Sequence, residues 1–100
     1  MKDEQIAILD FLKQNAMGID NAIKIEDIAT AIGVPPQGTN NDNVRKWIKE
    51  LVGTYQECIG TYEKGAFIIT NDEECDLAVK YLERKNLGPT LRNNWNNFSK

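Results

Sequence analysis

The chain has 100 residues, of which 41% are hydrophobic and 27% are charged, and its 12 Lys and Arg against 15 Asp and Glu give a formal net charge of −3. This composition excludes a disordered chain, and the length fits one domain, because domains usually span about 100–150 residues. The sequence contains no histidine. Nucleophiles activated by histidine and most catalytic zinc sites are therefore excluded, so we expect a binding module and not an enzyme.

Two cysteines, Cys58 and Cys75, are too few for a disulfide scaffold or a structural zinc site. Cys75 falls at a predicted helix N-terminus, where a thiolate can be redox-active, but the neighbouring carboxylates oppose the thiolate, so both cysteines are interpreted as small hydrophobic residues. The N-terminus lacks the apolar stretch of a signal peptide, and no run approaches the roughly 18 apolar residues of a membrane span. We expect a reduced, cytoplasmic protein without a cofactor, a metal or a membrane partner.

Apolar spacing predicts two helices in the first third of the chain. Residues 3–15 begin with acids and carry a broad apolar face, and Gly18 ends this segment. A short extended stretch at 22–25 leads into a second helix, which stops at Gly33 because glycine suits the position after a helix C-cap. The apolar stripe of the second helix consists of Ile25, Ile28, Ala29 and Ile32.

A third helix follows the loop at 35–38. Residues 39–42 predict a capping box at its start, and Gly53 closes it. Its apolar stripe consists of Val44, Trp47, Ile48, Leu51 and Val52.

The hydrophobic period then changes from that of a helix to that of a strand. Runs at 55–59 and 65–69 predict a hairpin with its tip at 60–64. Residues 70–74 are typical of a helix start, and the following helix is predicted to run to about Arg84. Its apolar stripe consists of Leu77, Ala78, Tyr81 and Leu82.

The order of elements over residues 3–85 resembles that of winged helix-turn-helix DNA-binding domains. Residues 25–34 resemble the second helix of that family, with an inner alanine and a glycine at the turn, and residues 43–51 resemble its recognition helix. Residues 64–69 with 71–74 are similar to the returning wing strand and the next helix of small phage and prophage winged-helix proteins. The resemblance implies an α+β fold with a three-helix core, a β-hairpin wing and an additional C-terminal helix.

The third helix carries the candidate DNA-binding surface. Residues 43–49 hold three basic residues and no acid, and the helical period turns them away from the apolar stripe. Lys and Arg neutralise phosphates or contact guanine, and Asn can pair with adenine. The alternative is an ordinary solvated helix face. The resemblance implies that this helix lies in the major groove of DNA, with contacts from Asn41, Asn43, Arg45, Lys46 and Lys49.

The wing is a second candidate contact. The resemblance implies that Tyr62 and Lys64 touch the DNA backbone or minor groove. Glu63 between them weakens the positive field, and a single lysine is a poor reader of the minor groove. The alternative is that a charged tip keeps the edge of the ribbon soluble.

Four acids follow the hairpin, at positions 72, 73, 74 and 76. At a helix N-terminus they are stabilised by the helix dipole. A metal site is the alternative, but consecutive carboxylates spread around a helical turn and do not converge. We therefore interpret this cluster as structural.

Residues 88–100 form a basic, Asn-rich extension to the winged-helix domain predicted at 1–87. Gly88 and Pro89 separate it from the preceding helix, and its apolar residues are spaced as in a short helix. Aromatic residues among basic ones can stack on single strands, but packing on this domain or on a second copy is favoured, which makes a homodimer an expected partner. The apolar residues are Leu91, Trp95 and Phe98, and the basic ones from the end of the preceding helix onward are Arg84, Lys85, Arg92 and Lys100.

The leading hypothesis is therefore a double-stranded DNA-binding protein of phage or mobile-element origin, acting in transcription regulation or replication. The alternative is a winged-helix module for protein–protein contact, because the acidic total charge repels DNA at long range. A variant of that alternative is an acidic inhibitor of a nucleic-acid-binding partner, suggested by the acids at 72–76.

Overall fold

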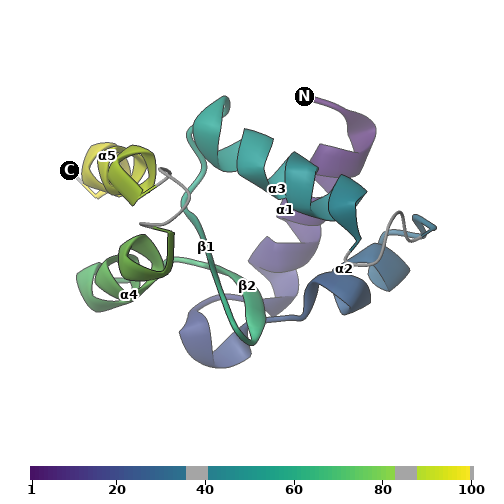
Figure 1. Ribbon diagram of the computed structural model, residues 1–100, viewed down its shortest axis with the longest axis horizontal. Helices are drawn as coiled ribbons and strands as arrows, with labels where there is room; N and C mark the ends of the chain where they lie inside the picture. Colours follow the sequence, from purple (N-terminus) through teal and green to yellow (C-terminus); the bar gives the residue numbers. More distant parts are fainter. Residues whose placement is uncertain (36–40, 83–87, 100) are drawn as a thin grey trace.

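The computed structural model of the chain describes residues 1–35, 41–82 and 88–99. Over these residues the chain forms five α-helices, one short 3-10 turn and a two-stranded antiparallel sheet (Figure 1), which confirms the α+β class. In chain order the elements are α1 (Asp3–Asn15), η1 (Ile19–Asn21), α2 (Ile25–Ala31), α3 (Asp42–Gly53), β1 (Ile59–Tyr62), β2 (Gly65–Ile68), α4 (Asp72–Leu82) and α5 (Gly88–Phe98).

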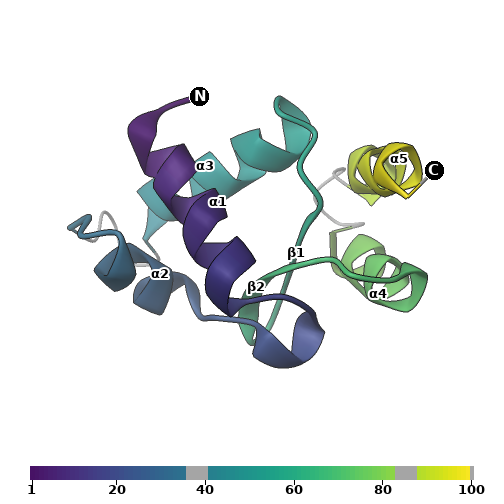
Figure 2. The same ribbon diagram turned by 180° about the vertical axis from the view of Figure 1, so that it is seen from behind.

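The first three helices pack together on one side of the hairpin. α1 and α3 cross, and α2 lies near one end of this pair (Figures 1 and 2). Ile8, Ile28 and Val44 are fully buried between these helices. All three belong to the predicted apolar faces, so the helical period identified the inward side of each helix. The predicted stop of α2 is also confirmed, since Gly33 adopts a φ of 74° directly after the C-cap.

The start of α3 differs from the capping box predicted at 39–42. Asn41 is the N-cap residue, and its side chain makes no capping hydrogen bond. Its backbone is left-handed, with φ 55° and ψ 53°, whereas a capping side chain normally projects from an extended backbone. Thr39 and Asn40, like residues 36–38 of the predicted loop, lie outside the described residues.

The second strand of the hairpin begins at its predicted residue, Gly65, whereas the first strand is displaced along the chain. Strands were expected at 55–59 and 65–69 with a tip at 60–64. β1 instead occupies the predicted tip, and only Glu63 and Lys64 form the turn to β2. The side chains that reach the two faces of the sheet therefore differ from those expected for the first strand.

Packing against Gly60 explains this displacement. Gly60 was interpreted as a turn glycine, but it lies inside β1, where the ring of Phe67 covers it. A Cβ atom at position 60 would lie 2.5 Å from Phe67 Cζ and 3.0 Å from Ala78 Cβ. A glycine in a strand often marks such a close approach. The strand predicted at 55–59 is interrupted at Gln56, which has a φ of 58°.

Backbone hydrogen bonds tie β2 to the segment between α1 and α2. Ile23 N–H donates to Ala66 O and Ala66 N–H donates to Ile23 O, each at 2.9 Å. Ile68 N–H donates to Ala16 O at 2.8 Å, and Gly18 N–H donates to Ile68 O at 2.9 Å. The short strand predicted in this segment is thus reduced to isolated bridges, which nevertheless cover the outer edge of β2.

α4 lies across the hairpin from α1 and α2, and its buried side differs from the predicted stripe (Figures 1 and 2). Cys75, Ala78 and Leu82 are buried. Leu77 and Tyr81, which were expected inside, are 51% and 45% exposed. The predicted stripe was wider than one packed face, and only the side that meets β1 and α5 is covered.

α5 packs beside α4 and against α3 (Figures 1 and 2). Leu91 and Trp95 are buried, which confirms the predicted packing of this segment on its own chain. Phe98, the last residue of the stripe, is 72% exposed. The predicted end of α4 near Arg84 and the domain boundary after residue 87 lie outside the described residues.

The side chain of Asn94 connects α5 to the end of α3 by a hydrogen bond. The side chain is 5% exposed, and its Nδ2 donates to Val52 O at 2.8 Å and to Glu57 O at 3.1 Å. Asn94→Ala leaves both carbonyls without this donor, so we expect a loss of about 1–3 kcal/mol in the free energy of unfolding. Urea denaturation measures it, and the exposed Asn93→Ala serves as the control. Equal effects of the two substitutions would contradict this role.

Candidate nucleic-acid interface

α3 presents a basic side to solvent. Val44, Ile48 and Leu51 are buried in the core, while Arg45, Lys46 and Lys49 are exposed, together with Asp42 at the start of the helix. This is the orientation predicted from the helical period. Polar and apolar residues are more sharply separated on α3 than on α1, α4 and α5, so its inward and outward sides are well defined.

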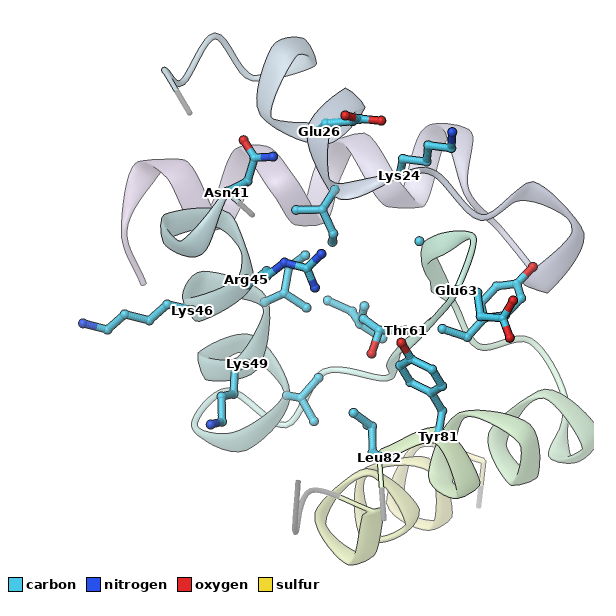
Figure 3. Close-up of a pocket in the computed structure, with 16 residues that line it drawn as sticks. Lys24, Glu26, Asn41, Arg45, Lys46, Lys49, Thr61, Glu63, Tyr81 and Leu82 are labelled. Atoms are coloured by element: carbon cyan, nitrogen blue, oxygen red, sulfur yellow. The ribbon is translucent and has the colours of Figure 1, made fainter. Parts of the chain in front are cut away.

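A groove with a volume of about 880 Å³ runs beside α3. Its walls are α3, the start of α2, β1 and the end of α4 (Figure 3). Its charged lining residues are four basic and two acidic, in a chain whose net charge is −3. The groove therefore has a locally positive lining. These six residues are Lys24, Arg45, Lys46, Lys49, Glu26 and Glu63.

The basic residues of α3 point in two directions. Figure 3 shows the side chain of Arg45 directed into the groove, whereas Lys46 and Lys49 extend outward from the helix. A partner that lies across α3 can therefore meet the two lysines on its outer side and Arg45 on its groove side. The helical period likewise places Lys46 and Lys49 opposite the apolar stripe and Arg45 at its flank, but a helical wheel does not show the neighbouring walls of the groove.

Asn41 and Asn43 occupy the beginning of α3. Asn41 lines the groove. Asn43 uses its side chain locally, since Nδ2 donates to Pro35 O at 3.3 Å and Oδ1 accepts the backbone N–H of Val44 at 2.9 Å. Contact between the Asn43 amide and a base would require exchange of these bonds.

The two predicted wing residues lie in different surroundings. Tyr62 is half-buried in the wall of the groove, where its hydroxyl donates to Ile19 O at 3.2 Å and its ring meets Phe67 edge-on at 5.8 Å. Lys64 is exposed at the turn, beyond the residues that line the groove. Tyr62 therefore lines the same groove as α3, and Lys64 does not.

Thr61 and Tyr81 line the groove but were not predicted as site residues. Tyr81 belonged to the predicted buried stripe of α4, and Thr61 to the predicted hairpin tip. The available signal was the width of that stripe, since Leu77 and Tyr81 share one side of the helix at the i, i+4 spacing. That signal indicates exposure and does not indicate which surface the side chain joins.

Two of the acids at the start of α4 bind side chains of α5. Trp95 Nε1 donates to Asp72 Oδ1, and Arg92 pairs with Asp76. The hydrogen bond that Arg92 donates to Asp76 raises the pKa of Arg92. Arg92 of the basic C-terminal segment is therefore engaged within the chain, while Arg84, Lys85 and Lys100 lie outside the described residues.

Glu74 faces inward and is 8% exposed. Its Oε2 accepts Ile19 N–H at 2.8 Å, and its Oε1 accepts Thr70 N–H at 2.8 Å and the Thr70 hydroxyl at 2.7 Å. Burial by itself raises the pKa of this carboxyl, but the three hydrogen bonds outweigh it and lower the pKa. Glu74 N–H also donates to Asn71 Oδ1 at 2.8 Å, which caps α4.

Neither cysteine is activated as a nucleophile. Burial, with a contribution from the charge of Glu57, raises the pKa of Cys58 to about 11, and burial also raises the pKa of Cys75. Both thiols are therefore protonated at neutral pH. Within residues 1–35, 41–82 and 88–99, no group of His, Cys, Asp and Glu could hold a metal ion, and no helix is long and apolar enough to cross a membrane.

The features of this interface come from the structure of this chain alone. Comparisons with family models, curated proteins and solved structures find no match for this chain. The exposed basic residues of α3 and the groove beside them are complementary in charge to an anionic surface.

Proposed function

We propose that this chain is a winged-helix protein that binds double-stranded DNA with α3 in the major groove. The order of three helices and a hairpin supports this proposal, as does the bridge between Ile23 and Ala66, which stands where that family has a short strand. In this arrangement α3 is the recognition helix and the hairpin is the wing. The proposed setting is a phage or mobile element, in transcription regulation or replication.

The observation that carries the proposal is the charge of α3. Its exposed side holds Arg45, Lys46 and Lys49, and residues 43–49 contain no acid. The major groove of B-DNA admits one α-helix, and phosphates flank it on both sides. Lysines at the outer side of α3 would neutralise phosphates, and the guanidinium of Arg45 could address a phosphate or a guanine edge.

Charge reversal of the lysines tests this proposal. We expect labelled duplex DNA to bind at low salt and to dissociate steeply as salt rises, as fluorescence anisotropy measures. Lys46→Glu and Lys49→Glu should each weaken binding, and the double substitution should abolish it. Loss of one phosphate contact is expected to reduce the slope of log K against log salt by about 1.

Lys13→Glu is the matched control, because Lys13 is an exposed lysine in the last turn of α1. It makes the same change in net charge away from the groove and should retain binding. Absence of duplex binding at low salt would overturn the proposal. An equal loss in Lys13→Glu would mean that total charge, and not α3, governs the association.

A protein partner is the second candidate, and the exposed side of α4 favours it. Leu77 and Tyr81 are 51% and 45% exposed beside a shallow apolar hollow lined by Ile19 and Phe67. Apolar side chains left uncovered in this way are typical of contact surfaces. Stoichiometric capture of a partner after nuclease treatment, lost in Leu77→Glu, would support this function over DNA binding.

A further inference from the structure

Three hydrogen-bond donors from three different elements point into the groove beside α3 (Figure 3). They are the guanidinium of Arg45 on α3, the hydroxyl of Thr61 on β1 and the hydroxyl of Tyr81 at the end of α4. The backbone at Tyr81 is fixed by the packing of α4, since the adjacent Leu82 is buried, while the Tyr81 side chain is 45% exposed. The set therefore depends on the packing of α4 against β1 and not on a mobile side chain alone.

The chemistry of these donors matches a phosphate group. A guanidinium presents a planar fork that two phosphate oxygens can accept, and hydroxyl groups can donate to the remaining oxygens. The acids that line the groove, Glu26 and Glu63, lie at its periphery in Figure 3, while Arg45 reaches its middle. The favourable position for an anion is therefore central, beside the guanidinium of Arg45.

We propose that this groove holds one backbone phosphate of the bound DNA, with Arg45 as its charge partner and Thr61 and Tyr81 as hydrogen-bond donors. This inference rests on the proposed function and adds α4 to the DNA-contacting surface. A phosphate held on the groove side of α3 would fix the orientation of that helix on the duplex. Because phosphates carry no base identity, the contact contributes affinity and not sequence preference.

Removal of single hydroxyl groups tests the contact on duplex DNA. Tyr81→Phe and Thr61→Val are each expected to weaken binding by about threefold to tenfold, equally for duplexes of unrelated sequence, with an unchanged salt slope. Arg45→Gln should also reduce the slope by about 1. Tyr55→Phe is the matched control, since Tyr55 is 40% exposed but lies outside the groove lining. It should bind as the unmodified chain does.

A titration with inorganic phosphate tests the same site without DNA. At low ionic strength, heteronuclear NMR is expected to show saturable shifts at Arg45, Thr61 and Tyr81, which Arg45→Gln abolishes and acetate does not reproduce. Shifts spread evenly over the lysines, or none, would overturn the phosphate site. Saturable shifts at these residues without any binding of duplex DNA would support the phosphate site and contradict the proposed binding of duplex DNA.

The two proposals can also fail separately on DNA. If Lys46→Glu and Lys49→Glu abolish binding while Tyr81→Phe and Thr61→Val leave it unchanged, the phosphate site is wrong and the proposed function stands.

Discussion

Gly65→Ala is expected to lower the free energy of unfolding by about 3–5 kcal/mol, as measured by urea denaturation. Gly65 adopts a φ of 122°, and a Cβ atom there would lie 1.9 Å from the carbonyl oxygen of Ile23 and 2.7 Å from Lys24 N. Both are backbone atoms, so no side-chain rotation relieves the clash. Movement of the chain would break the paired hydrogen bonds between Ile23 and Ala66. A domain of this size has only about 5–15 kcal/mol of net stability.

Gly33→Ala is the control that separates the effect of the steric clash from the effect of the positive φ. Gly33 also has a positive φ, 74°, but no atom lies within 4 Å of a Cβ placed there. Its replacement should cost only the conformational strain, about 1–2 kcal/mol. Equal costs at the two positions would show that β2 can move away from Ile23 freely. The proposed wing would then lack a fixed attachment to the helices.

Glu74→Gln is expected to lower the free energy of unfolding by about 2–3 kcal/mol at neutral pH. The substitution keeps the shape of the side chain, but an amide NH₂ replaces one of the two oxygens that accept from Ile19 and Thr70. One backbone donor then faces another donor in a buried position. Glu73→Gln, one residue earlier and exposed, is the control and should change the stability little.

The pH dependence of stability has a definite sign at Glu74. Its pKa in the folded chain is lowered from the ordinary value of 4.5, so the unfolded chain binds the proton more tightly. The stabilisation is complete well above pH 4.5 and declines as the pH falls through the lowered pKa of the folded state. Denaturation series at several pH values should show a smaller acid loss in Glu74→Gln than in the unmodified chain. Parallel losses would contradict this assignment.

The part of the candidate interface that lies on a single helix could be predicted from the sequence. The orientation of Arg45, Lys46 and Lys49 away from the core follows from the spacing of apolar residues within α3. The groove was not predictable, because Thr61 and Tyr81 reach it only after β1 has packed against α3 and α4 against β1. Their chain neighbours contain no signal for that arrangement.

The same division holds for the fold. The helical segments, the stop at Gly33 and the inward sides of α2 and α3 could be predicted from the sequence, because local hydrogen bonds and a period of 3.6 residues govern these features. The strand boundaries around Gly60 and the inward orientation of Glu74 and Asn94 could not, because they arise from contacts made in the folded chain. Each of these features depends on atoms from distant segments. The ring of Phe67 occupies the space that a side chain at position 60 would need. The backbone groups that bond to Glu74 and Asn94 need a partner because water is excluded from them.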